Sequence, residues 1–232
     1  MKNLFAVCSC SKTNQSEFDK SPLGRSLLKL ALACPHEQLL FLDNVLGLSE
    51  CYNLAMKECV KKNIPYLVCI HDDVFLLDVF WQEKLLAAFN DYQIVGLAGT
   101  SKLRIYPGAK IAWHTCSEQK DWKGAVQHPI QNKTEAPTIW TNFGIAPAEC
   151  TAIDGLFIAI DINKLKEKNV EFDPRFKFDF YDLDFSIACN KAGLKIGVSN
   201  IATMHMSHGA GLHDESYSKT QTEFINKWRG QK

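Results

Sequence analysis

An apolar strand that ends in three polar residues is the feature that most constrains the fold of this chain. Residues 65–70 read Pro-Tyr-Leu-Val-Cys-Ile, and His71-Asp72-Asp73 follows directly. A strand without a charged position is typical of the interior of a parallel sheet, where helices cover both faces. Ligands of such sheets bind at the carboxyl ends of the strands, so we expect a site at this tripeptide.

Strand and helix patterns alternate along the first hundred residues or so. The predicted strands are residues 4–10, 39–42, 65–70 and 94–98. The helices between them are expected to begin at Ser21, Ser49 and Asp78, residue types that accept hydrogen bonds from the first turn of a helix. This alternation predicts an α/β fold with a mostly parallel central sheet flanked by helices.

Residues 99–150 lose this regularity and are rich in Pro, Gly, Trp, His and Lys. So long a segment in a compact chain predicts an irregular insertion that serves as a binding loop or lid. After it we expect a strand at 153–160, a helix capped by Asp161, a helix closed by Gly193, a strand at 195–198, a polar loop at 203–209 and an amphipathic C-terminal helix.

The composition excludes several classes of protein. The 232 residues include 26 Lys+Arg and 26 Asp+Glu, so no net charge draws in nucleic acid or anionic membranes. No run approaches the roughly 18 apolar residues of a membrane span, and the stretch at 4–7 is too short for a signal sequence. The 9 Cys include no Cys-x-x-Cys pair, which indicates reduced thiols. We therefore expect one cytoplasmic domain with at most peripheral contact with the inner face of a membrane.

Acidic residues at the end of a buried strand need a positive partner, because each uncompensated carboxylate would cost several kcal/mol there. A divalent cation such as Mg²⁺ or Mn²⁺ fits Asp72 and Asp73, since hard cations bind carboxylates and substrate diphosphates together. The alternative is that both side chains cap a turn or lie in solvent.

Two later clusters add candidates. Asp182 and Asp184 lie at the start of a predicted helix after three aromatic residues, and His205 lies in a late polar loop with His208 and Gly209. Acids at a helix N-terminus can be simple caps, an interpretation that stays open, most of all for Asp184. His205 is a plausible third metal ligand.

Taken in order, these segments resemble family 2 GT-A glycosyltransferases over nearly the whole chain apart from the insertion. The matching segments are Asn53 in the second helix, residues 66–74, Ile153-Asp154-Gly155, residues 180–185 and the late His with Gly. The family's strand-end motif is Asp-x-Asp, whose last acid binds the metal. The match is Asp73, with His71 in place of the first Asp, as in a His-x-Asp-Val subgroup.

The resemblance implies a role for each matching residue. Asp182 would be the catalytic base, with Tyr181 where the family has Glu, and Asp73 with His205 would bind Mn²⁺ or Mg²⁺. Asp154-Gly155 would be the turn that lines donor and acceptor, with Gly155 allowing the backbone to approach sugar. The residues expected to contact the nucleotide sugar are Ser9 with the loop that runs from it to Thr13, Asp43, Asn44, Asn53, His71, Asp72, Asp154 and Gly155. A plain turn residue at Asp154 and a solvated helix position at Asn53 remain alternatives.

The resemblance also implies the reaction. A sugar would pass from a nucleoside diphosphate donor, UDP by family frequency, to a hydroxyl of a glycan or glycolipid such as a bacterial surface polysaccharide, with inversion. Residues 1–98 would form the nucleotide-sugar-binding half, residues 99–150 the lid, and residues 151–232 the acceptor and catalytic half. Two other interpretations stay open: a metal-dependent phosphohydrolase that uses His71-Asp72, and a non-catalytic sugar- or nucleotide-binding domain.

Overall fold

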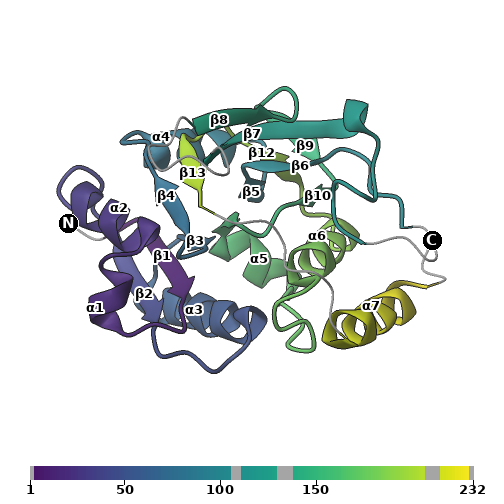
Figure 1. Ribbon diagram of the computed structural model, residues 1–232, viewed down its shortest axis with the longest axis horizontal. Coiled ribbons are helices and arrows are strands. Elements are labelled where there is room, and N and C mark those ends of the chain that lie inside the picture. Colours follow the sequence, from purple (N-terminus) through teal and green to yellow (C-terminus); the bar gives the residue numbers. More distant parts are fainter. Residues whose placement is uncertain (1–2, 106–110, 130–137, 207–214, 230–232) are drawn as a thin grey trace.

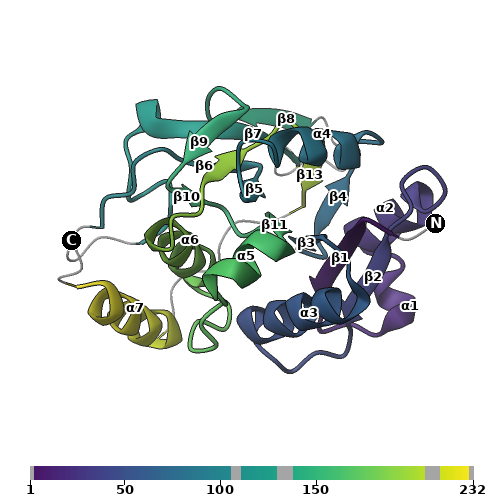
Figure 2. The same cartoon turned by 180° about the vertical axis from the view of Figure 1, so that it is seen from behind.

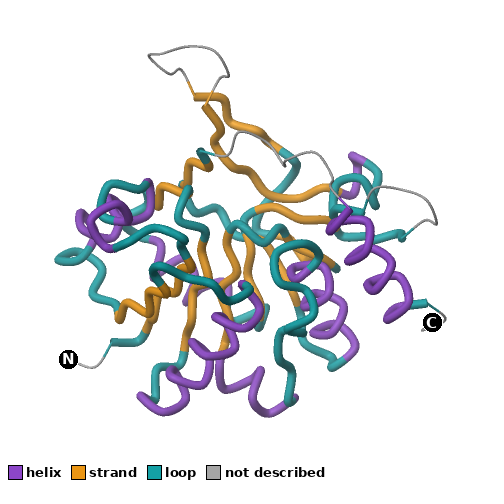
Figure 3. The backbone as a smooth tube through the Cα atoms, turned by 60° about the horizontal axis from the view of Figure 1, so that its bottom comes forward, coloured by secondary structure: helices purple, strands orange, loops and turns teal. Residues whose placement is uncertain are grey.

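Two β-sheets that share a central region, with helices packed around them, form the core of the computed structural model (Figure 1). The structure describes residues 3–105, 111–129, 138–206 and 215–229. The strands run through the middle of the molecule and the helices surround them, as Figure 3 shows. The expected α/β fold is confirmed.

The larger sheet has seven strands in the order β2-β1-β3-β11-β5-β12-β9. They are β1 (Phe5–Cys10), β2 (Glu37–Phe41), β3 (Tyr66–Ile70), β5 (Ile94–Gly96), β9 (Ala148–Cys150), β11 (Phe157–Asp161) and β12 (Ile196–Val198). β1 pairs in parallel with β2 and β3, and β12 pairs in parallel with β5. β11 is antiparallel to β3 and β5, and β9 is antiparallel to β12.

The sheet is therefore more mixed than the sequence pattern predicts. The reason is the route of the chain before β11. It returns from the smaller sheet at the carboxyl edge of β3, where the amide of His71 donates to the carbonyl of Leu156 at 3.1 Å. A strand that starts from this edge must run antiparallel to β3, whereas a crossover helix would have brought the chain back to the other edge.

The smaller sheet has the order β10-β6-β7-β13-β4, and β8 pairs with β7. Its strands are β4 (Val74–Leu76), β6 (Ala98–Thr100), β7 (Trp122–Pro129), β8 (Thr138–Asn142), β10 (Ala152–Ile153) and β13 (Thr203–His205). Two predictions are wrong here. The segment 99–150 contributes strands β7, β8 and β9, most of β6 and the 3₁₀ turn η1 (Gln119–Asp121), so it is not irregular, and His205 lies on a strand, not in a loop.

Seven helices accompany the sheets in the described part of the chain. They are α1 (Gln15–Phe18), α2 (Pro22–Leu30), α3 (Leu48–Lys62), α4 (Trp81–Ala88), α5 (Ile162–Lys168), α6 (Tyr181–Lys191) and α7 (Glu215–Trp228). Figure 2 shows α3 and α5 side by side in front of the larger sheet, where α3 packs on β1 and β3 and α5 on β11.

Two of the four predicted N-cap residues cap their helices, and the other two do not. Ser21 caps α2 and Asp161 caps α5, each accepting a backbone hydrogen bond from the first turn. Ser49 does not cap α3, which begins at Leu48 after Gly47; its hydroxyl donates to the carbonyl of Phe176 at 2.6 Å. α4 begins at Trp81, although the carboxylate of Asp78 still accepts from the amide of Phe80.

The interior position of β3 is confirmed. Residues 67–70 and, on its neighbour β11, residues 157–160 are fully buried. All nine Cys are free thiols, as predicted. A search of the described residues finds no helix with the length and apolar character needed to cross a membrane.

Candidate active site

The turn at residues 71–73 carries the chain from the larger sheet to the smaller one, between β3 and β4. β13 pairs antiparallel with β4, and this register sets His205 opposite Val74. The amide of Met206 also donates to the carbonyl of Asp73 at 2.8 Å. The strand pairing therefore brings His205 beside Asp73, although the two are far apart in the sequence.

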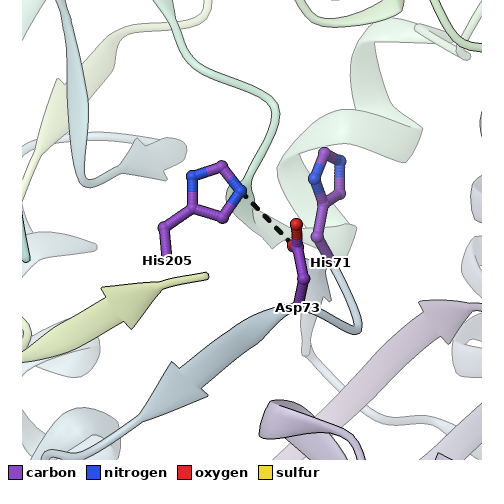
Figure 4. A group of neighbouring side chains, drawn as sticks. All are labelled: His71, Asp73 and His205. Carbon is purple, nitrogen blue, oxygen red and sulfur yellow. Dashed lines mark ion pairs between the residues drawn. The ribbon is translucent and has the colours of Figure 1, made fainter. Parts of the chain in front are cut away.

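His71, Asp73 and His205 form a group able to hold a metal ion (Figure 4). One ligand atom from each lies within 4.8 Å of the others. Nε2 of His205 is 3.3 Å from Oδ1 of Asp73, and this buried oxygen has no hydrogen-bond partner among the described residues. A divalent cation would satisfy it, and imidazole with carboxylate is a donor set that suits Mn²⁺. The predicted ligands Asp73 and His205 meet here, and His71 joins them.

The ionisation of the three groups follows from burial and from their contacts. Burial lowers the pKa of His71 even though Asp73 opposes it, so the ring is neutral. Burial alone would raise the pKa of Asp73, but His205, with smaller contributions from His71 and a backbone amide, outweighs burial and the pKa is lowered. Burial alone would lower the pKa of His205, but Asp73, with a smaller contribution from Asp154, outweighs burial and the pKa is raised. A neutral imidazole and an ionised carboxylate are the forms that bind metals. Because Asp73 stabilises the protonated form of His205, a metal ion that binds here would displace the extra proton from His205.

Asp72 faces away from this group. Its Oδ2 accepts a hydrogen bond of 2.5 Å from the hydroxyl of Ser11, which also lies 2.8 Å from the hydroxyl of Thr13. Asp72 thus contacts the loop after β1, whereas its neighbour Asp73 belongs to the metal group.

That loop lines a pocket of about 830 Å³ at the carboxyl ends of β1 and β2. The predicted nucleotide-contacting residues Asp43, Asn44 and Asp72 all line it. Lys12 of the predicted contact loop lines it too, as does Lys177, which no sequence pattern indicated. The full lining is Cys10, Ser11, Lys12, Thr13, Asp43, Asn44, Val45, Leu46, Gly47, Leu48, Asp72, Lys177 and Phe178.

Ser9 and Asn53, also predicted to contact the nucleotide sugar, do not line this pocket. Ser9 is fully buried in β1. The side-chain amide of Asn53 donates to the carbonyl of Phe172 at 2.8 Å, and its carbonyl accepts from the amide of Phe172 at 2.9 Å. Asn53 therefore holds α3 to the segment before α6, which neither the nucleotide role nor the solvated alternative described.

Asp182 lies in the first turn of α6 with both carboxylate oxygens fixed. Oδ1 accepts from the amide of Leu183 at 2.8 Å, and Oδ2 accepts from the amide of Gly155 at 3.0 Å. Burial raises the pKa of Asp182 to about 7, and the nearby Asp154 adds to this effect although the two amides oppose it. An acid with this pKa exchanges protons readily near neutral pH.

The residue before α6 has a strained backbone. Phe180 has φ 66 and ψ 0, in the left-handed region that a bulky side chain rarely adopts. Its ring is buried and packs against Tyr217 and Phe224 of α7, at centroid distances of 5.0 and 5.3 Å. The packing holds a conformation that costs on the order of 1–3 kcal/mol, and it does so next to Asp182.

The turn at Asp154-Gly155 faces the start of α6. Oδ2 of Asp154 accepts from the indole of Trp113 at 2.7 Å, and Oδ1 accepts from the amide of Leu156 at 2.9 Å. A side chain on Gly155 would collide with the hydroxyl of Tyr181. Glycine is thus required here because the hydroxyl of Tyr181 lies so close to the backbone. The prediction had been that sugar would make this close approach.

A second pocket, of about 260 Å³, joins the metal group to these acids. His71 lines it together with Asp154 and Asp182. The rest of its lining is Ile111, Ala112, Trp113, His114, Gly155, Phe178, Asp179, Phe180, Tyr181, Leu183 and Tyr217. Phe178, which is 68% exposed, lines both pockets and stands where they adjoin.

The 99–150 segment supplies part of this site. Trp113 and His114 line the smaller pocket. His128 of β7 lies beside His205, with ring centroids 5.8 Å apart, and its Nδ1 is 3.0 Å from the hydroxyl of Thr141. None of these could be singled out from the sequence. His208 and Gly209 lie outside the described residues.

Asp184 anchors the C-terminal helix. It is 1% exposed, Lys227 Nζ lies 2.7 Å from its Oδ1, and the indole of Trp228 donates to Oδ1 at 2.9 Å. Lys227 also contacts Asp173 at 2.8 Å. Asp184 is thus neither a simple helix cap nor a lining residue of either pocket, and it ties α6 to α7.

Replacing Asp184 with Ala is expected to lower the free energy of unfolding by roughly 3 kcal/mol, because it leaves a largely buried ammonium and a partly buried indole N–H with fewer partners. Urea denaturation monitored by tryptophan fluorescence would measure the loss. Asp91→Ala, at an exposed acid, is the control and should change stability by less than about 0.5 kcal/mol. Equal stabilities of the two variants would contradict the anchoring role.

Residues 24–228 match the sequence profile of the glycosyltransferase-like family. The chain belongs to this family. No curated protein matches the chain by sequence. The resemblance noted in the sequence is therefore confirmed at the level of the family.

Solved structures agree on the fold. GalNAc-T7, solved with UDP, GalNAc and Mn²⁺, is 11% identical, and the match covers 99% of this chain and 49% of that one with a TM-score of 0.58. The catalytic domain of Drosophila β1,4-galactosyltransferase 7, solved with xylobiose, is 10% identical over 94% of this chain and 79% of that one, with a TM-score of 0.54. A mutant of the Drosophila enzyme was solved with manganese, UDP-Gal and xylobiose. A197 from STIV is 12% identical over 91% and 98% of the two chains, with a TM-score of 0.50. The fold is that of GT-A glycosyltransferases.

Proposed function

We propose that this member of the glycosyltransferase-like family moves a sugar from a nucleoside diphosphate donor to a hydroxyl of a glycan or glycolipid, with inversion at the anomeric carbon. The observation that carries the proposal is the smaller pocket. Its lining includes His71, which belongs to the metal group, and Asp182, whose pKa lies near neutrality. A metal-stabilised leaving group and a general base at one pocket are what a single displacement requires.

The larger pocket is the proposed donor site. Asp43 and Asn44 can hydrogen-bond a base and ribose, and Lys12 and Lys177 can face the diphosphate. UDP is the proposed nucleotide, since similar folds are solved with UDP or UDP-Gal. Phe178 stands between this pocket and the smaller one, where its exposed ring can stack on the transferred sugar.

His71, Asp73 and His205 would hold Mn²⁺ or Mg²⁺. When bound, the ion supplies stabilisation of the negative charge that develops on the departing diphosphate. Membership of the His-x-Asp-Val subgroup, with an imidazole where Asp-x-Asp transferases have their first acid, is part of this proposal. Two imidazoles and one carboxylate favour Mn²⁺ over Mg²⁺, which prefers oxygen ligands.

Asp182 would take the proton from the acceptor hydroxyl as that oxygen attacks the anomeric carbon. The amides of Gly155 and Leu183 hold its two oxygens, so the base does not swing away. Trp113 holds Asp154, which also lines the pocket and can accept a hydrogen bond from a hydroxyl of the sugar or the acceptor. Aromatic residues of the 99–150 segment, the proposed lid, would form one wall of the acceptor site, opposite residues of the proposed acceptor and catalytic half at 151–232.

The pH dependence of the reaction should report on Asp182. A base acts only when ionised, and the pKa of this carboxyl lies at about 7. We expect kcat/KM for the acceptor to fall as the pH is lowered through about 7, and to level off above it. A profile flat between pH 5 and pH 8 would contradict this assignment of the base.

A thermal-shift screen tests the function directly. UDP-sugars are added with and without Mn²⁺, because a ligand that binds only the native state raises the melting temperature. We expect donor and Mn²⁺ together to raise the melting temperature more than the two do when added separately, followed by sugar transfer to a glycan acceptor in a product assay. Binding without turnover on any acceptor would favour a non-catalytic domain. Phosphate release from nucleotides without an acceptor would favour a phosphohydrolase, but His71-Asp72 lies in a turn after a strand and the family match is to transferases.

A further inference from the structure

The hydroxyl of Tyr181 bridges the metal group and the turn that faces the catalytic acid. It lies 2.7 Å from Nε2 of His71 and 2.9 Å from the carbonyl oxygen of Gly155. A phenol has one proton to donate, and a carbonyl oxygen can only accept. The hydroxyl of Tyr181 therefore donates a hydrogen bond to the carbonyl of Gly155. Its oxygen accepts a hydrogen bond from the N–H at Nε2 of His71, so the ring proton lies on Nε2.

This assignment decides which nitrogen of His71 can bind a metal. A neutral imidazole carries one proton, so a proton on Nε2 leaves the lone pair of Nδ1 free. His71, Asp73 and His205 surround one place, and Figure 4 shows the His71 ring across the Asp73 carboxylate from His205. With Nε2 engaged by Tyr181, Nδ1 is the nitrogen left for an ion there.

The position of Tyr181 is tightly determined. The side chain is 4% exposed, and its ring packs edge-on against Tyr52 with centroids 5.9 Å apart. Its hydroxyl occupies the place where a Cβ of residue 155 would be, so glycine is required opposite it. The hydroxyl could not move far from His71 without breaking the contact with Gly155.

We propose that Tyr181 is a positioning residue for the metal ion: it fixes His71 in the tautomer that presents Nδ1 and ties this ligand to the helix that bears Asp182. The proposal rests on the proposed function, because it needs a divalent ion at His71, Asp73 and His205. Hydrogen bonds to the far nitrogen of a ligating histidine fix the ring and raise its basicity, and their loss typically weakens metal binding about 10- to 100-fold.

The chain offers a matched control. Tyr52 is also a fully buried tyrosine and touches the Tyr181 ring, but its hydroxyl has no hydrogen-bond partner among the described residues. Tyr181→Phe and Tyr52→Phe each remove one buried oxygen and keep the ring. Only the first removes a contact to His71.

The experiment titrates each protein with Mn²⁺ alone and follows the free ion by electron paramagnetic resonance. We expect Tyr181→Phe to weaken Mn²⁺ binding about 10- to 100-fold and Tyr52→Phe to bind as the parent protein does. Equal affinities for the parent and Tyr181→Phe would overturn this proposal and leave the proposed function standing. A parent protein that does not bind Mn²⁺ would overturn the metal site itself, and with it both proposals.

A second measurement does not need the metal. Long-range proton–nitrogen correlations of ¹⁵N-histidine-labelled protein, with His71→Gln used to assign the signal, report which ring nitrogen is protonated. We expect the proton of His71 on Nε2 in the parent and in Tyr52→Phe, and a mixture of tautomers in Tyr181→Phe. A proton on Nδ1 in the parent protein would overturn the proposal.

Discussion

Replacing Asp182 with Asn is expected to reduce turnover by about 100- to 10,000-fold, because a general base contributes on that order and an amide cannot take a proton from the acceptor. Donor binding should change little, since Asp182 does not line the larger pocket. Single-turnover transfer assays would measure the first effect, and calorimetric titration with donor and Mn²⁺ the second.

The substitution has a structural cost that must be separated from the catalytic one. Each oxygen of Asp182 accepts one backbone N–H, so the amide nitrogen of Asn would face a donor and lose about 1–2 kcal/mol of stability. Assays well below the melting temperature remove this contribution. The residual activity should also lose its fall through pH 7. Turnover within a few-fold of the parent would remove Asp182 from the role of base.

Replacing Asp73 with Ala is expected to abolish the Mn²⁺-dependent part of donor binding. Asp73 is the only carboxylate in the metal group, and its buried Oδ1 is the oxygen that a cation would satisfy. Two imidazoles alone hold a divalent ion weakly beside a diphosphate. Donor affinity measured with and without Mn²⁺ should become equal in the variant, and turnover should fall by two orders of magnitude or more.

Two further variants test the assignment of Asp73, one at a second proposed ligand and one at a control position. His205→Ala should resemble Asp73→Ala, because the two side chains are in contact in one site. Asp72→Ala should keep the Mn²⁺ response, because that carboxylate bonds Ser11 and lines the larger pocket. If Asp72→Ala loses the Mn²⁺ response while Asp73→Ala keeps it, the metal lies on the other side of the tripeptide.

The buried strand and the alternation around it could be predicted from the sequence, because burial on both faces leaves a continuous apolar run. The same reasoning failed for residues 99–150. β7 includes Gly124, Lys123 and Pro129, residue types that usually mark loops, and its pairing with β6, β8 and β13 overrides these local preferences. The available signal was the spacing of Gly124 and Val126, two residues apart, which the structure places on the buried face of β7.

Within the site, the sequence identified residue types at strand ends but not what they contact. Asp73, His205 and Asp182 could be named because metal binding and proton transfer need such residues. The roles of Asn53, Trp113 and Tyr181 depend on partners 119, 41 and 110 positions away, and no local pattern records such distances. Asp184 looked like a cap for the same reason, since its partners lie on the last helix.

The route of the chain between the two sheets has a consequence for when the site exists. His71 and Asp73 are held at the end of β3, but His205 reaches them only after β13 has paired with β4, near the end of the chain. A nascent or partly folded chain therefore presents scattered ligands with little affinity for the ion. The ion binds the completed fold alone, so a concentration 100 times its Kd would add about 2.7 kcal/mol to the stability of the finished protein. Under the proposed function, manganese uptake would therefore report successful folding as well as serve the chemistry.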